Sequence, residues 1–370
     1  MKPIETKFVK VNQVADETEL LKAPAKALVE GGTVVFPTET VYGIGANALD
    51  EVAIDKIYEA KNRPSDNPLI VHIAKLSQLE ILVESTPEMA KALMRAFWPG
   101  PITFVLKKKS VIPDKVTGGL DTVAVRMPEN AIALKLIELA GVPVAAPSAN
   151  TSGKPSPTKA AHVIEDLAGR VDYIIEGSDA VVGLESTVLD VTGDIPVILR
   201  PGKITREMIV EVAGNCEIDP GIVMGTEGKS ASVVPKSPGM KYKHYAPKAD
   251  VEVVIGTSSK LIPVFESYVE AAINGGYKVA IMSFDEDLLV LEKILKGKYT
   301  VSDLSAHVFL CSQGSIRNLD EFARLLFGGL RKSDDRECQK IVVRGVEEDG
   351  LGLAIMNRLN KASAGKVTRI

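Results

Sequence analysis

The chain has 370 residues, of which 45% are hydrophobic, 25% charged and 5% aromatic. This composition excludes disordered, collagen-like and membrane-embedded chains, and the length favours two domains of unequal size. The 44 basic and 48 acidic residues give a net charge of -4, which argues against a nucleic-acid-binding surface spread over the whole chain.

The three cysteines, Cys216, Cys311 and Cys338, lie far apart and form no CxxC pair. The sequence therefore predicts neither a disulfide framework nor a zinc site. The N-terminal segment carries charges without an apolar core, and no run approaches the roughly 18 apolar residues of a membrane span. We therefore expect a soluble, cytoplasmic protein that does not contact membranes.

The first 215 residues alternate short β-rich runs with amphipathic helical patterns. The runs that predict strands are 32–37, 68–73, 102–107, 122–127, 173–176 and 186–190. The patterns that predict helices are 18–30, 51–61, 87–97, 130–140 and 158–168. Some strand pairs lack an intervening helix, so residues 1–215 are expected to form an α/β domain whose mixed, twisted sheet is flanked by helices.

Hydrophobic periodicity disappears over 216–248, where proline, glycine, serine and lysine accumulate without an apolar face. This segment is predicted to be a linker. A passive tether is one interpretation. A segment this long beside compact domains also fits a functional lid.

Residues 249–370 show a regular alternation of strand and helix patterns. Strands are predicted at 251–255, 278–283, 307–311 and 340–344, and helices at 259–274, 286–296, 319–331 and 350–362. The alternation predicts a smaller parallel-sheet domain of Rossmann-like type, built from right-handed crossovers.

Common nucleotide-binding and hydrolase motifs are absent. The run Gly228-Lys229-Ser230 resembles the end of a P-loop, but Val223 stands where the first glycine is required. The third glycine of a dinucleotide motif is missing near residue 352, no GxSxG occurs, and the four histidines lack metal spacing. A nucleotide would therefore be bound by basic side chains, hydroxyls and backbone amides.

Two segments near the N-terminus carry groups suited to small ligands. In 37–45 (PTETVYGIG), glycines allow close backbone approach and hydroxyls offer hydrogen bonds, although an ordinary turn has the same composition. In 61–72 (KNRPSDNPLIVH), Lys61 and Arg63 could bind neighbouring phosphates or merely complement a helix C-terminus. His72 closes this segment, and a lone histidine of this kind is often a core residue.

Three later segments add arginines and hydroxyls at predicted strand ends. Strand alternation places Thr122, Ala124 and Arg126 on one face, and a buried arginine needs an anionic partner from the protein or from a substrate. Ser156, in the polar run 145–158, either caps a helix or helps to form a hydrogen-bonding floor for a nucleotide. Arg200 ends another strand. Together these groups predict a site for a small, negatively charged substrate.

These segments occur in the order of a known family. FPTETVYG, KNRPSDNPLIVH, WPGPITFVL, VAVRMP, APSANTSGKPSPT, ESTVLDV, ILRPG and the linker run SPGMKYKHYAP span essentially the whole chain. In this order and spacing the sequence closely resembles the YrdC-like threonylcarbamoyl-AMP synthases in their longer, two-domain form. The resemblance implies an N-terminal catalytic domain at 1–215, a linker or lid at 216–248 and a C-terminal Rossmann-like domain at 249–370.

The resemblance also implies a nucleotidyltransferase that joins L-threonine, bicarbonate and ATP into threonylcarbamoyl-AMP for a tRNA modification. L-threonine would be bound by Thr40, His72, Arg126, Ala146 and Ser186. ATP would be bound by Lys61, Arg63, Asn67, Thr122, Ser148, Ser156 and Arg200, with Tyr245, ahead of Tyr242, closing over the nucleotide from the linker. Mg²⁺ would accompany ATP without dedicated metal-ligating residues. A downstream tRNA threonylcarbamoyl transferase would receive the product, and the resemblance leaves room for a weak contact with tRNA.

Two alternatives come from other functional classes. The first is an RNA-binding module that uses a basic concave face without catalysis, against which stand the net charge and the lack of aromatic stacking motifs. The second is a carbamoyl-transfer enzyme of hydrogenase maturation that shares the YrdC-like domain. The absence of zinc-finger cysteines argues against the second.

Overall fold

The computed structural model describes residues 4–223 and 245–370, which belong to two compact units. The described part of the first unit comprises 4–152 and 156–223, and that of the second comprises 153–155 and 245–370. The first unit continues past residue 215 through β11 (Glu217–Ile218) and α9 (Pro220–Val223). Residues 224–244, most of the predicted linker, lie outside the described residues.

The first unit is built on one mixed sheet, to which eleven strands contribute among the described residues. The strand order is β1-β8-β2-β3-β7-β4-β6-β5-β9-β10-β11. The further strands are β1 (Lys7–Lys10), β2 (Val34–Phe36), β3 (Gly43–Asn47), β4 (Ile70–His72), β5 (Ile102–Lys107), β6 (Thr122–Arg126), β7 (Val144–Ala145), β8 (Tyr173–Glu176), β9 (Thr187–Asp190) and β10 (Val197–Arg200). Parallel pairs such as β4–β6 alternate with antiparallel pairs such as β5–β6, which confirms the predicted mixed sheet.

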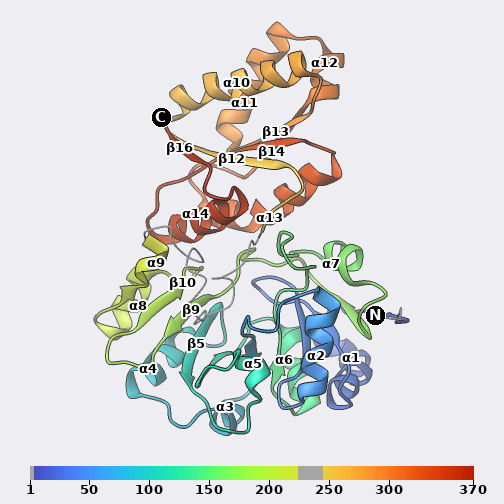
Figure 1. Ribbon diagram of the computed structural model, residues 1–370, viewed down its shortest axis with the longest axis vertical. Helices are drawn as coiled ribbons and strands as arrows, with labels where there is room; N and C mark the ends of the chain where they lie inside the picture. The colour runs from blue at the N-terminus through green and yellow to red at the C-terminus, as the bar shows by residue number, and fades with distance from the viewer. Residues whose placement is uncertain (1–3, 224–244) are drawn as a thin grey trace. The chain divides into compact units, whose positions relative to one another are not determined.

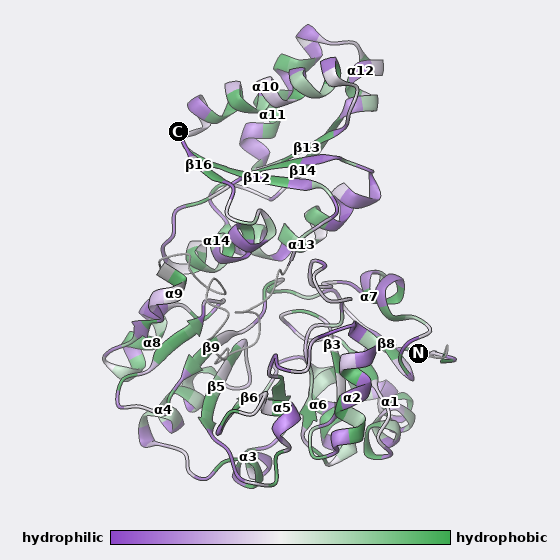
Figure 2. Cartoon of the chain, viewed as in Figure 1, coloured by the Kyte–Doolittle hydropathy of each residue, from purple (hydrophilic) through white to green (hydrophobic). Residues whose placement is uncertain are grey.

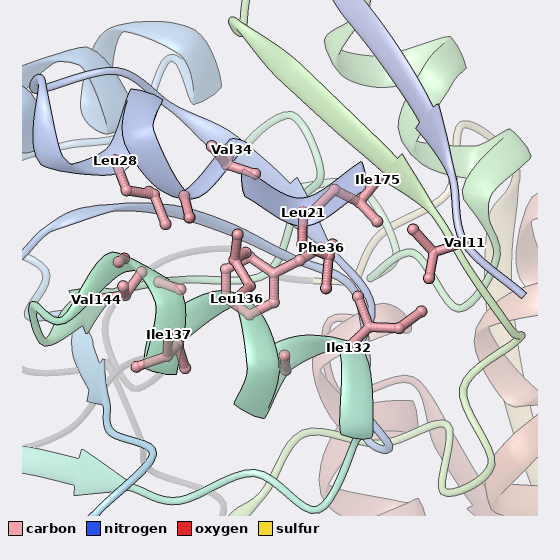
Figure 3. Close-up of a cluster of buried hydrophobic side chains, with 14 residues drawn as sticks. Val11, Leu21, Leu28, Val34, Phe36, Ile132, Leu136, Ile137, Val144 and Ile175 are labelled. Atoms are coloured by element: carbon pink, nitrogen blue, oxygen red, sulfur yellow. The ribbon is translucent and has the colours of Figure 1, made fainter. Parts of the chain in front are cut away.

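Helices cover this sheet and supply its main core. They are α1 (Val14–Val29), α2 (Glu51–Lys61), α3 (Leu76–Leu82), α4 (Glu88–Phe97), α5 (Asp114–Thr117), α6 (Ala131–Ala140), α7 (Ala160–Leu167) and α8 (Arg206–Ala213). Figure 3 shows side chains of α1, β2 and α6 converging, with Leu21, Phe36 and Leu136 fully buried. Burying each such side chain contributes roughly 1.5–3 kcal/mol, so this cluster anchors the strands that carry the site.

Helix ends in this unit follow their local sequence. Asp50 accepts hydrogen bonds from the first amides of α2, and the helix ends where Asn62 adopts a left-handed conformation with φ 51°. Gly141 ends α6 in the same way, at φ 69°, as the sequence predicts. The predicted helix 51–61 and strand 102–107 match the observed elements, whereas the short strands β1, β3 and β7 had no distinct sequence signal.

The second unit contains a parallel sheet of order β14-β13-β15-β12-β16 among the described residues. Its elements are β12 (Asp250–Ile255), α10 (Ser258–Gly275), β13 (Val279–Ser283), α11 (Asp285–Lys298), α12 (Val301–His307), β14 (Val308–Ser312), α13 (Leu319–Asp335), β15 (Lys340–Arg344), α14 (Gly350–Ala362) and β16 (Val367–Arg369). In Figure 1, α10, α11 and α12 lie on one face of this sheet, and α13 and α14 on the other. This confirms the predicted Rossmann-like domain, to which the structure adds α12 and β16.

The second unit also includes Gly153–Pro155. Arg331 on α13 donates to the carbonyl of Pro155 from Nε at 3.1 Å and from Nη2 at 2.7 Å, and the amide of Ala246 donates to the carbonyl of Gly153 at 2.9 Å. This short piece of the N-terminal sequence is thus held by residues that follow it by more than 90 positions.

The hydropathy pattern agrees with these layers. Figure 2 shows the strands β12 and β13 largely in hydrophobic colours, while α10 alternates between polar and apolar residues. Within the described ranges, no helix has both the length and the apolar character needed to cross a membrane.

Gly45 provides a test of the packing beneath the predicted ligand segment. A Cβ at this position would lie 2.6 Å from Val144 Cγ1 and 2.7 Å from Phe36 Cε1. Gly45→Ala should therefore lower the free energy of unfolding of the first unit by about 1–3 kcal/mol, measured by urea denaturation. Gly193→Ala is the matched control, because its nearest neighbour would lie 4.0 Å away. Equal stability of the two variants would contradict this packing.

Candidate active site

Arg126, at the end of β6, is the centre of a buried polar network. Its side chain is 4% exposed, and Nη2 forms an ion pair with Glu39 Oε1 at 2.5 Å. Nη1 donates to Thr40 Oγ1 at 2.8 Å, and Nε donates to the Gly100 carbonyl at 3.2 Å. The anionic partner that the sequence required for this arginine is therefore a carboxylate of the protein.

Sequence reasoning did not select Glu39, although it lies in the PTETVYG run. Its side chain is 4% exposed, and its second oxygen, Oε2, has no hydrogen-bond partner among the described residues. A buried acceptor without a partner costs roughly 1–3 kcal/mol. This unmet oxygen beside Arg126 therefore indicates a place where a further group can bind.

The hydroxyls of the same turn have a fixed hydrogen-bond direction. Thr38 Oγ1 donates to the Val41 carbonyl at 2.6 Å, so its single proton is committed. The 2.8 Å contact between Thr38 Oγ1 and Thr40 Oγ1 must then be donated by Thr40. Thr40 accepts from Arg126 and donates to Thr38, which fixes both the guanidinium and the turn.

His72, the last residue of β4, lies directly beside Arg126 in the β4–β6 pairing. Burial, followed by the charge of Arg126, lowers the pKa of His72 from its usual value near 6.5 to about 3. The ring is therefore neutral at physiological pH, and its Nδ1 donates to the Ile70 carbonyl at 3.2 Å. A neutral imidazole can orient a substrate but adds no positive charge.

Ala146 is connected to His72 through the same carbonyl. Its amide donates to the Ile70 oxygen at 2.9 Å, and its side chain is 4% exposed. Ala146 is thus paired with Ile70, two residues before His72 on β4, and its methyl group belongs to the buried core cluster.

Ser186 and Arg200 form a separate polar group, which begins two strands away from Arg126 in the sheet. Strand β5 lies between β6 and β9, and Ser186 Oγ, just before β9, lies 2.7 Å from Thr103 Oγ1 on β5. Arg200 donates to the Ser186 carbonyl from Nε at 3.0 Å and from Nη2 at 2.9 Å, and to Ser186 Oγ at 3.1 Å. Gly202 permits this approach, because a Cβ there would lie 2.4 Å from the amide of Thr187.

Lys61 and Ser148 form a second group, to which the structure adds Asn150. Lys61 is 1% exposed, and its Nζ donates to the carbonyls of Ser148 and Asn150. Ser148 Oγ donates to Asn150 Oδ1 at 2.5 Å. The lysine therefore fixes the loop that carries both polar side chains. Asn150 lies in the SAN run of the sequence, but a single asparagine in a polar loop gave no distinct signal.

Arg63, Asn67 and Thr122 are three further residues predicted to bind ATP. Arg63 is half-buried and donates to the carbonyls of Asn67 and Pro68 at 3.4 and 3.2 Å. Asn67 is 1% exposed, and its Oδ1 has no partner within the described ranges. Thr122 begins β6 and shares a sheet face with Arg126, about 13 Å away along the strand.

Ser156 does not cap a helix, so that interpretation is wrong. Helix α7 begins at Ala160 with Lys159 before it, while Ser156 Oγ donates to Glu185 Oε1 at 2.5 Å. Both side chains are buried, at 1% and 7% exposure. Glu185, which sequence reasoning also did not select, thus orients the serine hydroxyl.

Tyr245 is placed within the second unit. Its ring lies 5.1 Å from that of Phe327 and beneath the guanidinium of Arg358, at 5.9 Å, and the residue is 4% exposed. The closing of this tyrosine over a nucleotide stays a prediction, and Tyr242 lies outside the described residues. Within the described ranges, no group of three His, Cys, Asp or Glu side chains could hold a metal ion.

Comparisons with known proteins decide the family. A family profile described as "Telomere recombination", for Sua5, YciO and YrdC proteins, matches residues 26–202, and one described as "Threonylcarbamoyl-AMP synthase, C-terminal domain" matches 204–364. The threonylcarbamoyl-AMP synthase of Pyrococcus abyssi is 47% identical over 99% of this chain and 100% of its own length. The chain belongs to the threonylcarbamoyl-AMP synthase family.

Other relatives agree with this assignment. The synthase of Bacillus subtilis is 45% identical, with 98% of both chains covered. A crystal structure of P. abyssi Sua5 complexed with L-threonine has a TM-score of 0.87 at 47% identity, covering 99% of this chain and 100% of that one. The resemblance found in the sequence and the two-domain fold are therefore confirmed, while the roles of individual site residues in this synthase-family chain stay predictions.

The depressed pKa of His72 predicts acid sensitivity. An unfolded histidine binds a proton below about pH 6.5, whereas the folded one resists protonation down to about pH 3. Its contribution to stability is complete above pH 6.5 and is lost as the pH falls through this window. When the pH is lowered from 6.5 to 4.5, the free energy of unfolding, measured by urea denaturation, should fall by on the order of 2 kcal/mol more in wild type than in His72→Gln. Equal decreases in the free energy of unfolding of the two proteins would contradict a buried, neutral histidine.

Proposed function

We propose that this chain catalyses the formation of L-threonylcarbamoyl-AMP and pyrophosphate from L-threonine, bicarbonate and ATP. The observation that carries the proposal is the buried Arg126 network, in which a guanidinium fixed by Glu39, Thr40 and Gly100 lies on the strand next to the neutral His72. Such a site suits the carboxylate of a small amino acid. The L-threonine complex of the P. abyssi relative supports the same substrate.

The reaction needs positioning more than a protein nucleophile. The threonine amine and bicarbonate give a carbamate with loss of water. A carbamate oxygen then attacks the α-phosphorus of ATP, the bond to the β-phosphate oxygen breaks, and pyrophosphate leaves. Arg126 binds the threonine carboxylate, while Arg200 and Arg63 offset phosphate charge and Ser148, Ser156, Asn67 and Thr122 orient the nucleotide.

Mg²⁺ is expected to accompany ATP. Glu39 and Glu185 each have one carboxylate oxygen engaged, by Arg126 and by Ser156, and no group of three metal-ligating side chains occurs among the described residues, so the cation would be held mainly by phosphate oxygens and water. When bound, it would neutralise the charge that develops on the pyrophosphate leaving group. No residue of this chain is assigned to it.

We also propose the cellular setting that this activity requires. The product is a reactive mixed anhydride, so a transferase that moves its threonylcarbamoyl group to tRNA must act downstream, with at most weak tRNA contact by this chain. We propose that the protein acts in the cytoplasm, where ATP and tRNA are both present. A linker that closes over the site would protect the anhydride from water, and most of the predicted segment, 224–244, lies outside the described residues.

The burial of the cations disfavours a non-catalytic RNA-binding module. Arg126, Arg200 and Lys61 are 4%, 5% and 1% exposed, and each is bound to acceptors of the protein. Binding of an RNA backbone requires exposed cations along a surface. These buried groups instead suit a small ligand that enters the site.

Pyrophosphate release by the purified protein tests the proposal. We expect release that requires ATP, L-threonine and bicarbonate together, and a decrease of about tenfold in kcat/KM when serine replaces threonine, because the methyl group that serine lacks is predicted to contact Ala146. Mass spectrometry should detect threonylcarbamoyl-AMP. ATP hydrolysis that is independent of threonine and bicarbonate would contradict the proposed reaction.

A further inference from the structure

The unpartnered oxygen of Glu39 is a feature that the proposed reaction, as described so far, does not use. Oε1 is bound to Arg126 Nη2 at 2.5 Å, and Oε2 has no partner among the described residues although the side chain is 4% exposed. A buried carboxylate oxygen is stable when it accepts a hydrogen bond or faces a positive charge. The structure therefore leaves one negative acceptor open beside the guanidinium.

The carboxylate cannot readily turn away from this position. The backbone on both sides is fixed, because the Glu39 carbonyl accepts from the Val182 amide at 2.8 Å and the Thr40 carbonyl accepts from the Gly183 amide at 3.1 Å. Rotation of the side chain would also break the ion pair with Arg126. Oε2 is thus a preorganised acceptor.

The N–H groups of Arg126 are the second observation that bears on this oxygen. A guanidinium has five N–H groups, one on Nε and two on each terminal nitrogen. The protein engages Nε through Gly100, one Nη1 hydrogen through Thr40 and one Nη2 hydrogen through Glu39. One N–H group on each terminal nitrogen is then left to donate to a further acceptor.

We propose that Glu39 Oε2 binds the α-ammonium group of the amino-acid substrate, while Arg126 donates a remaining N–H group to its carboxylate. This inference rests on the proposed function, since it assigns the amino-acid end of that reaction. The ion pair is neutral overall and presents adjacent negative and positive groups. A zwitterionic amino acid presents the complementary pair on one carbon atom.

Glu185, also a buried carboxylate of the site, is engaged by Ser156, and the described groups that flank Arg126 carry no further negative charge. The Thr40 hydroxyl donates to Thr38 and accepts from Arg126, and His72 is neutral with its Nδ1 proton on Ile70. Glu39 therefore supplies the charge that recognises the amine. The site should select free α-amino acids and reject N-acylated amino acids and α-hydroxy acids.

The experiment is a cycle that changes the residue and the ligand in turn. Isothermal titration calorimetry would measure binding of L-threonine and of 2,3-dihydroxybutanoate, its α-hydroxy analogue, to wild type and to Glu39→Gln. Wild type should prefer threonine by about 10- to 100-fold. In Glu39→Gln this preference should shrink to within about threefold, because the amide removes the charge and keeps the size.

Asp287→Asn is the matched control. Asp287 is also a buried carboxylate, 1% exposed, that pairs with an arginine, Arg344, and has one oxygen without a partner among the described residues. This variant should keep the wild-type preference for threonine. Steady-state kinetics should show a raised KM for threonine in Glu39→Gln with an ATP KM within about twofold of wild type, a split that general loss of structure would not produce.

The outcomes separate this inference from the proposed function. An undiminished threonine preference in Glu39→Gln overturns the role of Glu39 and leaves the proposed reaction intact. Absence of threonine binding and of threonine-dependent pyrophosphate release in wild type overturns the proposed function. Should Glu39→Gln not fold, Glu39→Asp serves instead: a threonine KM raised at least about fivefold with an unchanged ATP KM supports the inference, and an unchanged threonine KM overturns it.

Discussion

The buried ion pair between Arg126 and Glu39 is the constraint on which the site depends. Two charges removed from water are stable only when their geometry and their remaining hydrogen bonds are well satisfied. The Thr38–Thr40 turn and the Gly100 carbonyl satisfy the guanidinium, and strand pairing places His72 beside it, whereas Glu39 Oε2 is left without a partner among the described residues. The same contacts that keep the pair stable also fix the direction in which its unused groups point.

The same sheet also carries residues that are predicted to bind the nucleotide. Thr122 and Arg126 lie on one face of β6, about 13 Å apart along the strand, so the residues predicted for the two ends of the ligand share one sheet face. Ser186 and Arg200 are connected to the neighbouring strands, and Lys61 holds the loop of Ser148 and Asn150. A reaction that joins two small molecules through an anhydride needs such fixed placement of both ends.

Local sequence signals predicted much of the fold but only part of the site. The pattern of 51–61, the β-rich run 102–107 and the alternation after residue 249 correspond to observed elements, because their periodicity is strong. Alternation along β6 placed Arg126 and Thr122 on one face. The two-residue strand β7 and the glycine-rich β3 carry too little pattern to be recognised.

What the sequence could not predict depends on contacts between distant residues. Glu39 and Glu185 lie in runs that were noted, but their importance depends on partners 87 and 29 positions away. Ser156 precedes a helix and has the composition of a cap, yet its hydroxyl binds Glu185. The assignment of Gly153–Pro155 to the second unit depends on Arg331, 176 positions later.

The most direct test of whether Arg126 organises the amino-acid end of the site is calorimetry on Arg126→Lys. This variant is titrated with L-threonine and, separately, with ATP. Lysine keeps the charge but cannot bind Glu39, Thr40, Gly100 and a carboxylate at once. The account predicts that threonine affinity falls by at least about 30-fold while ATP affinity stays within about threefold of wild type. Unchanged threonine affinity in a folded Arg126→Lys protein would contradict it.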